Sequence, residues 1–334
     1  MTVFVTGASG YLGRAVVERL LARGASVRCL LRGDPARLPW GDRVEIVRGD
    51  VTDRDAVRRG VAGADTVFHM AACVKTWVRD AREFDRVNVD AVEALIAAAR
   101  EAGVRRILYT SSFIGLGPSN GRVGDETTVH AGDRFRNDYE RTKAAGLARA
   151  RAAAAAGAPL VILIPGVVYG PGALTDGNHV AKIVADYLDR KLPGIPGSGD
   201  RLWTYAYVDD VADGHLLALD RARDGEAYAL GGEDADLRGV LALLAEISGV
   251  PAPRRHVPLG VLKAIGAAEV ALAGLTGRTP ELTPGVAEIY GCEWRISSEK
   301  AKRELGYRTT PLREGLALTV AWIRGARAGA KEKG

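Results

Sequence analysis

Short apolar runs alternate with segments of helical periodicity along the first half of the chain. Apolar, β-branched runs predict strands at residues 2–6, 26–31, 44–48, 66–69, 106–110 and 160–164. Between them, apolar positions three or four residues apart predict helices at residues 12–23, 53–61, 83–102 and 139–157. Strands that alternate with helices are typical of a parallel, doubly wound sheet. We therefore predict an α/β chain with a Rossmann-type sheet.

The second half is less regular and contains clusters of glycine and proline. Its periodicity predicts one strand and two helices, at residues 203–208, 211–219 and 312–325. We expect residues 1–165 plus about 200–225 to form a dinucleotide-binding domain. Residues 166–199 plus 226–334 would then form a smaller, mixed C-terminal domain that binds the substrate.

Composition and charge narrow the class of protein. Of 334 residues, 47% are hydrophobic and 26% are charged, which is ordinary for a soluble globular enzyme. The net charge is +5, but the basic residues are scattered and form no basic arm, so we do not predict a nucleic-acid partner. Cys29, Cys73 and Cys292 are too few for a disulfide framework and match no zinc motif. We therefore predict a reducing, cytoplasmic location and no metal.

Residues 257–276 are the most apolar stretch of the second half. They include five interruptions, at Pro258, Gly260, Lys263, Gly266 and Glu269. An integral membrane span needs about 20 predominantly apolar residues, so we predict none here. Residues 259–275 could wall an apolar pocket, form a dimer contact or belong to the core. We favour the core or the pocket wall over a membrane contact.

A glycine-rich loop connects the first predicted strand to the first predicted helix. Its spacing is G-x-x-G-x-x-G, and its place between a strand and a helix is the context of a dinucleotide-binding loop. Gly7 permits the tight turn, Gly10 lets the backbone approach a pyrophosphate, and Gly13 packs the helix on the strand. The helix N-terminus offers free N–H groups to a phosphate. The cofactor-binding residues predicted in this loop are Gly7, Ser9, Gly10, Tyr11, Leu12 and Gly13.

The end of the second strand bears on the choice between NAD and NADP. An acid at this place reads the 2′-hydroxyl of NAD, whereas this chain has Arg32. A guanidinium suits the 2′-phosphate of NADP, which favours NADP, but Asp34 could still reach a ribose, so NAD stays open. Asp50 and Val51 follow the third strand and are placed to meet the adenine.

A tyrosine, a lysine and a serine form the second constellation. Tyr139 and Lys143 are four residues apart on a predicted helix and therefore share one face. A neighbouring cation lowers the pKa of a phenol and readies it for proton transfer. Ser111 and Ser112 end a strand at the edge where α/β sheets bind ligands, and a serine there can donate to a carbonyl oxygen. The alternatives without a catalytic role are an ordinary surface i,i+4 pair for Tyr139 and Lys143, and a helix or turn cap for the serine.

With these motifs the chain resembles the extended short-chain dehydrogenases/reductases over nearly its whole length. The resembling stretches are residues 6–13, 50–51, 69–72, 88–89, 110–112, 139–143, 165–171, 208–210 and 297–307. The resemblance implies that Tyr139 is the acid/base, that Lys143 holds the nicotinamide ribose and lowers the pKa of Tyr139, and that Ser112 polarises the substrate carbonyl. It also implies cofactor contacts for Ala71, Ala72, Thr110, Pro165 and Val168.

Within that family, two positions separate this chain from the members that act on sugar nucleotides. Val167 and Trp203 stand where those members carry an Asn and an Arg, so a diphosphate would be poorly paired. Arg201 lies close and could serve an anion instead. The segment 164–171 is similar to dihydroflavonol reductase-like enzymes, and residues 71–77, 109–117, 138–144 and 192–200 are similar to farnesol dehydrogenase-like proteins. The substrate-contact residues predicted on this basis are Val74, Trp77, Phe113, Trp203 and Tyr205.

The resulting hypothesis is an NADP-preferring oxidoreductase, with NAD as the alternative cofactor. It would transfer hydride between the nicotinamide and an apolar or aromatic carbonyl/alcohol pair, a small-molecule substrate. One alternative is a nucleotide-sugar epimerase or dehydratase that retains its NAD. The other is a non-catalytic dinucleotide sensor on the same fold. Related enzymes are often dimers, so a homodimer is a further candidate, although no interface is legible.

Overall fold

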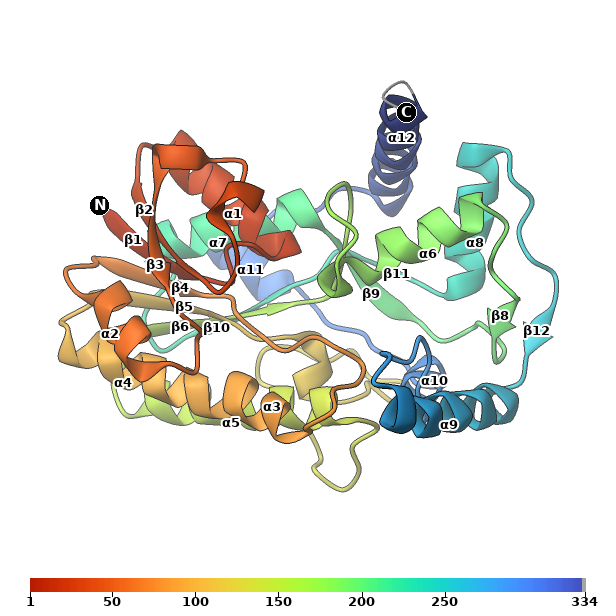
Figure 1. Cartoon of the computed structure of the whole chain (residues 1–334), viewed down its shortest axis with the longest axis horizontal. Helices are drawn as coiled ribbons and strands as arrows, with labels where there is room; N and C mark the ends of the chain where they lie inside the picture. The colour runs from red at the N-terminus through yellow and green to blue at the C-terminus, as the bar shows by residue number, and fades with distance from the viewer. Residues whose placement is uncertain (332–334) are drawn as a thin grey trace.

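Seven parallel strands form the central sheet of the computed structural model, which describes residues 1–331 (Figure 1). The strand order is β10-β6-β5-β4-β1-β2-β3. From β1 the chain adds β2 and β3 on one side and then β4, β5 and β6 on the other, as in a doubly wound sheet. The strands are β1 (Thr2–Thr6), β2 (Ser26–Leu31), β3 (Val44–Arg48), β4 (Thr66–His69), β5 (Arg106–Thr110), β6 (Leu160–Pro165) and β10 (Ala227–Leu230). The predicted Rossmann-type fold is therefore confirmed.

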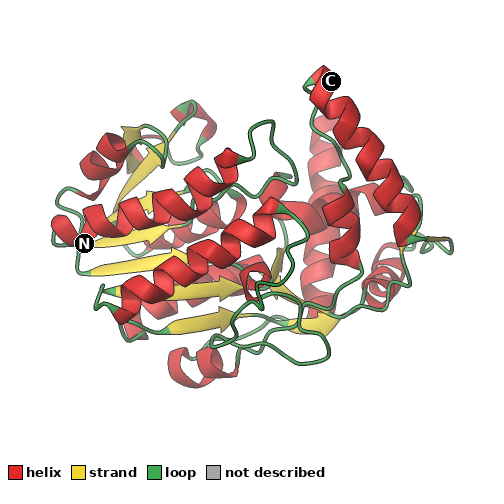
Figure 2. Ribbon diagram, turned by 90° about the horizontal axis from the view of Figure 1, so that it is seen from below, coloured by secondary structure: helices red, strands yellow, loops and turns green. Residues whose placement is uncertain are grey.

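Helices cover both faces of this sheet, which is why its central strands are apolar on both sides (Figures 1 and 2). One face carries α1 (Tyr11–Ala22), α7 (Val208–Arg221) and α11 (Glu299–Leu305). The other carries α2 (Arg54–Val61), α4 (Ala91–Glu101) and α5 (Asp138–Ala155). The short helical turns are α3 (Arg82–Asp85), the π-helical segment Arg86–Asp90, and 3-10 turns at Pro35–Arg37, Gly41–Arg43, Phe113–Leu116 and Asp176–Asn178.

The smaller part of the molecule is mixed, as expected. Its three-stranded sheet has the order β11-β9-β7, with β11 (Glu233–Ala235), β9 (Trp203–Tyr207) and β7 (Val167–Tyr169). A parallel pair joins β12 (His256–Val257) to β8 (Ile195–Pro196). The helices are α6 (His179–Leu188), α8 (Leu237–Ser248), α9 (Leu259–Thr276), α10 (Pro284–Tyr290) and α12 (Leu312–Lys331). The final helix continues past residue 325, where its end was predicted.

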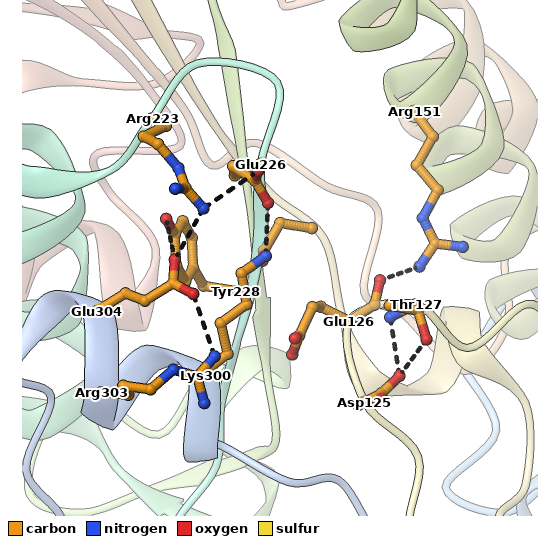
Figure 3. Close-up of polar contacts among 11 residues, drawn as sticks. Asp125, Glu126, Thr127, Arg151, Arg223, Glu226, Tyr228, Lys300, Arg303 and Glu304 are labelled. Carbon is orange, nitrogen blue, oxygen red and sulfur yellow. Dashed lines mark hydrogen bonds and ion pairs between the residues drawn. The ribbon is translucent and has the colours of Figure 1, made fainter.

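The division into two domains stays a prediction. Several elements, however, belong to the other sheet than the one to which that division assigned them. Strand β9 belongs to the small sheet, whereas β10 is an edge strand of the large one. Helix α11 also returns to the large sheet, and its polar residues reach β10 (Figure 3). Lys300 Nζ lies 2.6 Å from a Glu226 carboxylate oxygen, and the Tyr228 hydroxyl donates to Glu304 at 3.2 Å. The smaller part is thus built from segments that cross back and forth.

Helix α9 corrects one expectation. Only Gly266 and Ala273 of its residues are buried, so it is not a core helix, and it contributes no residue to the apolar pocket described below. Leu272 and Leu275 are 58% and 85% exposed. Among residues 1–331 it is the one helix long and apolar enough to cross a membrane, judged by length and composition alone.

A pair of glycine substitutions tests how closely α5 approaches the chain before α4. A Cβ atom at Gly146 would lie 2.2 Å from the Asn88 carbonyl oxygen, whereas Gly325 in α12 has open space around it. Gly→Ala inside a helix ordinarily stabilises by about 0.5–1 kcal/mol. We expect Gly325→Ala to follow that rule and Gly146→Ala to lower the free energy of unfolding by about 1–3 kcal/mol, because the added methyl overpacks the contact. Urea denaturation followed by circular dichroism measures both; a stabilising Gly146→Ala would contradict the close approach.

Candidate active site

The glycine loop between β1 and α1 forms an open cradle. Gly7 has φ +78°, a left-handed conformation that favours glycine. A Cβ atom at Gly13 would lie 2.1 Å from the Gly7 carbonyl oxygen, so only glycine lets α1 pack this closely on the loop. The helix has no side-chain cap at Gly10 and no acidic residue in its first turn. Its N-terminal N–H groups and positive dipole end therefore suit an anionic group such as a pyrophosphate.

The end of β4 lies against this loop. The Thr6 hydroxyl is 2.8 Å from His69 Nδ1, and Ala71 N donates to the same hydroxyl at 3.3 Å. A Cβ atom at Gly7 would lie 2.6 Å from Ala71 N, so the chain after β4 passes close beside the glycine loop. Burial lowers the pKa of His69 to about 3, and Lys143 adds to that effect. His69 is thus a neutral packing residue here.

The predicted adenosine end shows an arginine open to solvent. The Arg32 side chain is 73% exposed, and its guanidinium lies 3.3 Å from an Asp50 carboxylate oxygen. Asp50 Oδ1 also accepts from Thr52 N at 2.8 Å and from the Thr52 hydroxyl at 2.7 Å. Burial opposes but does not outweigh these hydrogen bonds and the Arg32 charge, so the pKa of Asp50 lies below its usual value. The structure therefore brings Arg32 and Asp50 together, with Val51 buried beneath.

The second constellation gathers where β5 ends and α5 begins. Asn137 caps α5 by accepting from Glu140 N at 2.8 Å, which fixes the turn that carries Tyr139. Lys143 is 3% exposed, and its Nζ donates to the Thr110 carbonyl oxygen at 3.3 Å. The Ser112 hydroxyl is near enough to the Tyr139 phenol to lower its pKa, and it accepts from Ile114 N at 3.4 Å. The serine thus lies beside the phenol and also caps the turn after β5.

The pKa values at this pair differ from the expectation. The resemblance implied that Lys143 lowers the pKa of Tyr139, but burial raises it to about 12, opposed by the hydrogen bond with Ser112. Burial also lowers the pKa of Lys143 to about 8. The reason is that desolvation disfavours both charged forms. The ammonium is directed to the end of β5, over the Tyr109 ring at 5.7 Å.

A buried carboxylate in the first turn of α5 was not found by sequence reasoning. Glu140 is fully buried, and its Oε1 lies 2.9 Å from His130 Nε2 and accepts from the Arg136 guanidinium at 2.6 Å. Its Oε2 accepts from Arg136 N at 2.8 Å. A buried carboxylate persists only when such partners satisfy it. The network fixes the loop that leads into α5. Sequence reasoning missed it because the role of Glu140 depends on contacts made in the folded chain.

Asn88 links the cofactor side of the site to α5. Its Oδ1 accepts from Cys73 N at 2.8 Å, and its Nδ2 donates to Cys73 O at 3.1 Å and to the Thr142 hydroxyl at 3.0 Å. Asn88 lies in the π-helical segment before α4, a local distortion that is frequent at functional sites. Cys73 is buried, as a small packing residue is.

An apolar pocket lies between α6, α8 and the small sheet. Its lining includes Val167, Ile183, Trp203, Tyr205, Val240 and Tyr290. The Trp203 and Tyr290 rings stack 5.4 Å apart. Arg201 is the one arginine or lysine among the described lining residues, and its Nε is 3.7 Å from an Asp200 carboxylate oxygen. Two predicted substrate residues, Trp203 and Tyr205, are therefore pocket residues.

The other predicted substrate residues, Val74, Trp77 and Phe113, do not line this pocket. Phe113 is connected to it indirectly, because its ring meets the Trp294 ring edge-on at 5.8 Å and Trp294 pairs with Trp203 in a β-bridge. This aromatic chain joins the neighbour of Ser112 to the pocket wall. The walls supplied by α6, α8 and Tyr290 were missed, because their apolar positions look like ordinary core positions in the sequence.

The remaining predicted cofactor residues lie at the carboxyl ends of β5 and β6 and in β7. Thr110 ends β5 and its hydroxyl bonds His215 Nε2 at 2.9 Å, while Pro165 ends β6 and Val168 lies in β7. The Tyr11 ring is buried against Gly170 and Gly172. At this position the backbone of α1, and not the tyrosine side chain, is therefore next to the glycine loop.

Comparison with known proteins agrees with this geometry. The family model described as NAD dependent epimerase/dehydratase family matches residues 3–231. A relative from Synechocystis, named a candidate dihydroflavonol 4-reductase, is 31% identical over 96% of this chain and 94% of its own length. A relative from Stigmatella aurantiaca, named 4-hydroxy-2-methyl-3-oxo-4-farnesyl-3,4-dihydroquinoline-1-oxide ketoreductase, is 31% identical over 92% of both chains.

Among solved structures, the dTDP-glucose 4,6-dehydratase DesIV of Streptomyces venezuelae superposes with a TM-score of 0.78. It is 26% identical, and the match covers 98% of each chain. The resemblance drawn from the motifs is thereby confirmed. The chain belongs to the NAD-dependent epimerase/dehydratase family of extended short-chain dehydrogenases/reductases, and it is an NAD(P)-dependent oxidoreductase.

Proposed function

We propose that the protein interconverts an apolar or aromatic carbonyl and its alcohol with NADP(H). The observation that carries this proposal is the apolar pocket walled by Val167 and Trp203, joined through Phe113 and Trp294 to the Ser112–Tyr139 site. An apolar pocket binds an apolar ligand by removing its surface from water. The relatives named as reductases of a flavonoid-type and a farnesyl-bearing ketone support the same substrate class.

The dinucleotide would lie along the carboxyl ends of the large sheet. The uncapped N-terminus of α1 would hold its pyrophosphate, and Ala71 and Ala72 would border it. Arg32 would pair with the 2′-phosphate, which favours NADP; its exposed guanidinium supports this role. When bound, the nicotinamide supplies or accepts the hydride.

Three side chains would handle the proton and the oxygen. A pKa of about 12 keeps Tyr139 protonated at neutral pH, so its phenol can donate to a carbonyl oxygen during reduction. The Ser112 hydroxyl would donate to the same oxygen and stabilise its developing charge. Lys143, held at the end of β5, would bind the nicotinamide ribose and place a cation near the phenol.

The second candidate is a sugar-nucleotide dehydratase or epimerase, favoured by the likeness to DesIV. Among the described residues, the lining offers a diphosphate Arg201, which already lies near Asp200, and His179, whose Nε2 is 3.3 Å from the Tyr290 hydroxyl. A diphosphate buried against Val167 and Trp203 would lack partners, which is costly. This argues for the reductase. A non-catalytic sensor would need neither Tyr139 nor Lys143.

A turnover assay tests the proposal. Purified protein is incubated with a panel of apolar and aromatic aldehydes, ketones and alcohols, and nicotinamide absorbance is followed with NADP(H) and NAD(H). We expect net turnover, and we expect Tyr139→Phe to lower it by about 10²-fold to 10⁴-fold, the usual contribution of a general acid. Tyr228→Phe, whose hydroxyl bonds Glu304 away from the site, is the control. Undiminished turnover in Tyr139→Phe would refute the mechanism, and retained dinucleotide without net turnover would favour the epimerase.

Lys143→Met should separate function from stability. The folded protein lowers the pKa of Lys143 from 10.5 to about 8, so between those values the unfolded chain binds more protons and this group makes stability rise with pH. Below pH 8 the buried ammonium destabilises the fold. We therefore expect Lys143→Met to lose turnover yet melt about 2–4 °C higher at pH 7, with the difference shrinking above pH 10. Calorimetry with the exposed Lys302→Met as control measures this; a lower melting temperature at pH 7 would contradict the burial argument.

Arg32→Ala tests the cofactor preference. Hydrogen bonds to charged groups contribute about 1.5–3 kcal/mol, so we expect KM for NADP(H) to rise by about tenfold or more while KM for NAD(H) changes little. Arg23→Ala removes a solvent-exposed arginine from the end of α1 and should change neither value. Unchanged kinetics with NADP(H) in Arg32→Ala would show that this guanidinium does not read the 2′-phosphate.

A further inference from the structure

The solvent face of α9 is apolar along its whole length. Seven of its exposed residues lie at three- and four-residue spacings and therefore form one apolar stripe on the helix: Val261, Ala264, Ile265, Ala268, Ala271, Leu272 and Leu275. Figure 1 shows α9 running along one edge of the molecule, beside α10. A contiguous exposed apolar surface of this kind marks an interaction site more often than a free surface.

The two charged side chains of α9 are engaged by the protein. Lys263 Nζ lies 2.9 Å from a Glu288 carboxylate oxygen on α10. Glu269 accepts from Glu281 N at 2.8 Å and from Leu282 N at 3.0 Å, both in the loop before α10. The helix thus turns its polar groups inward and its apolar residues outward, the reverse of an ordinary surface helix.

Basic residues flank both ends of the stripe. Arg254 and Arg255 are exposed just before the helix, and Arg278 is exposed just after it. Within residues 1–331, none of these three guanidinium groups forms an ion pair. The exposed acid nearby in the sequence is Glu281. The stripe therefore has a net positive border, which complements a negatively charged surface.

We propose that this face of α9 docks, in the plane of the interface, on an anionic lipid surface. The apolar stripe would enter the boundary of headgroups and acyl chains, and Arg254, Arg255 and Arg278 would meet the headgroups. The helix does not span the lipid, because Lys263 and Glu269 bind it to α10 and the preceding loop along its side. A second copy of the chain is the poorer partner, because pairing two such faces would bring like charges together.

The first turn of α9 lies beside the apolar pocket. The side chain of Leu259, the first residue of α9, packs directly on Gly197 and Gly291. A Cβ atom added at either glycine would lie 3.1 Å or 2.9 Å, respectively, from that side chain. These glycines adjoin Pro196 and Tyr290, which line the pocket. Resting on the proposed function, this arrangement lets an apolar substrate dissolved in lipid enter from the docked side.

Vesicle flotation of the full chain tests the proposal. The probes are vesicles of phosphatidylcholine, with or without added phosphatidylglycerol. We expect the protein to float with the anionic vesicles and Leu272→Glu/Leu275→Glu to abolish this. Val129→Glu/Leu318→Glu makes the same two changes at exposed apolar residues outside α9 and should retain binding. Arg254→Gln/Arg255→Gln should weaken binding about 30-fold, since each basic residue near the surface contributes about fivefold.

Two further measurements keep the outcomes separate. Turnover of a water-soluble carbonyl should be unchanged in all variants, because none of the substituted residues belongs to the site. Binding to vesicles by a protein without such turnover supports docking while refuting the proposed reductase. Absence of flotation with either vesicle, or flotation equally retained by Leu272→Glu/Leu275→Glu, overturns the docking. Light scattering that shows a dimer dissociated by Leu272→Glu/Leu275→Glu, without vesicle binding, overturns it in favour of a second copy.

Discussion

The burial of the Lys143 ammonium is the constraint on which the rest of the site depends. A buried ammonium is costly, and in the part of the chain that the structure describes the Lys143 ammonium donates to one acceptor, the Thr110 carbonyl oxygen at 3.3 Å. The surrounding structure must therefore be held firmly enough to keep that position dry. Asn88 fastens the β4 loop to α5, and the Glu140 network fixes the turn before it. The chemistry thus rests on a second set of buried polar contacts that never meet the substrate.

The same constraint decides where the proton lies. Burial raises the pKa of Tyr139 and lowers that of Lys143, so both neutral forms gain. A phenol that keeps its proton suits the reduction of a carbonyl, because the oxygen must be protonated as hydride arrives. The apolar lining beyond it favours a substrate whose one polar group is that oxygen.

Local patterns predicted the large sheet and the cofactor loop because both depend on short-range rules. The strands are visible in the sequence as apolar runs. The spacing of Gly7, Gly10 and Gly13 follows from how closely the backbone of the loop approaches the first turn of α1. The pocket walls, Glu140 and the place of β10 could not be predicted, because they depend on which distant segments meet. The exposure of α9 was mispredicted for a related reason: an apolar helix looks the same in a sequence whether protein or another surface covers it. The resemblance implied that Lys143 lowers the pKa of Tyr139, whereas burial raises that pKa and the Lys143 ammonium donates to the Thr110 carbonyl oxygen.

The most direct test of direct hydride transfer to an apolar carbonyl is an isotope measurement. NADPH carrying deuterium at C4, in each of its two positions in turn, is consumed with an apolar ketone, and the product alcohol is examined by NMR and mass spectrometry. The account predicts that one of the two labelled forms places a single deuterium on the carbinol carbon. Product without label from either form, or dinucleotide that stays bound and is never consumed, would contradict it.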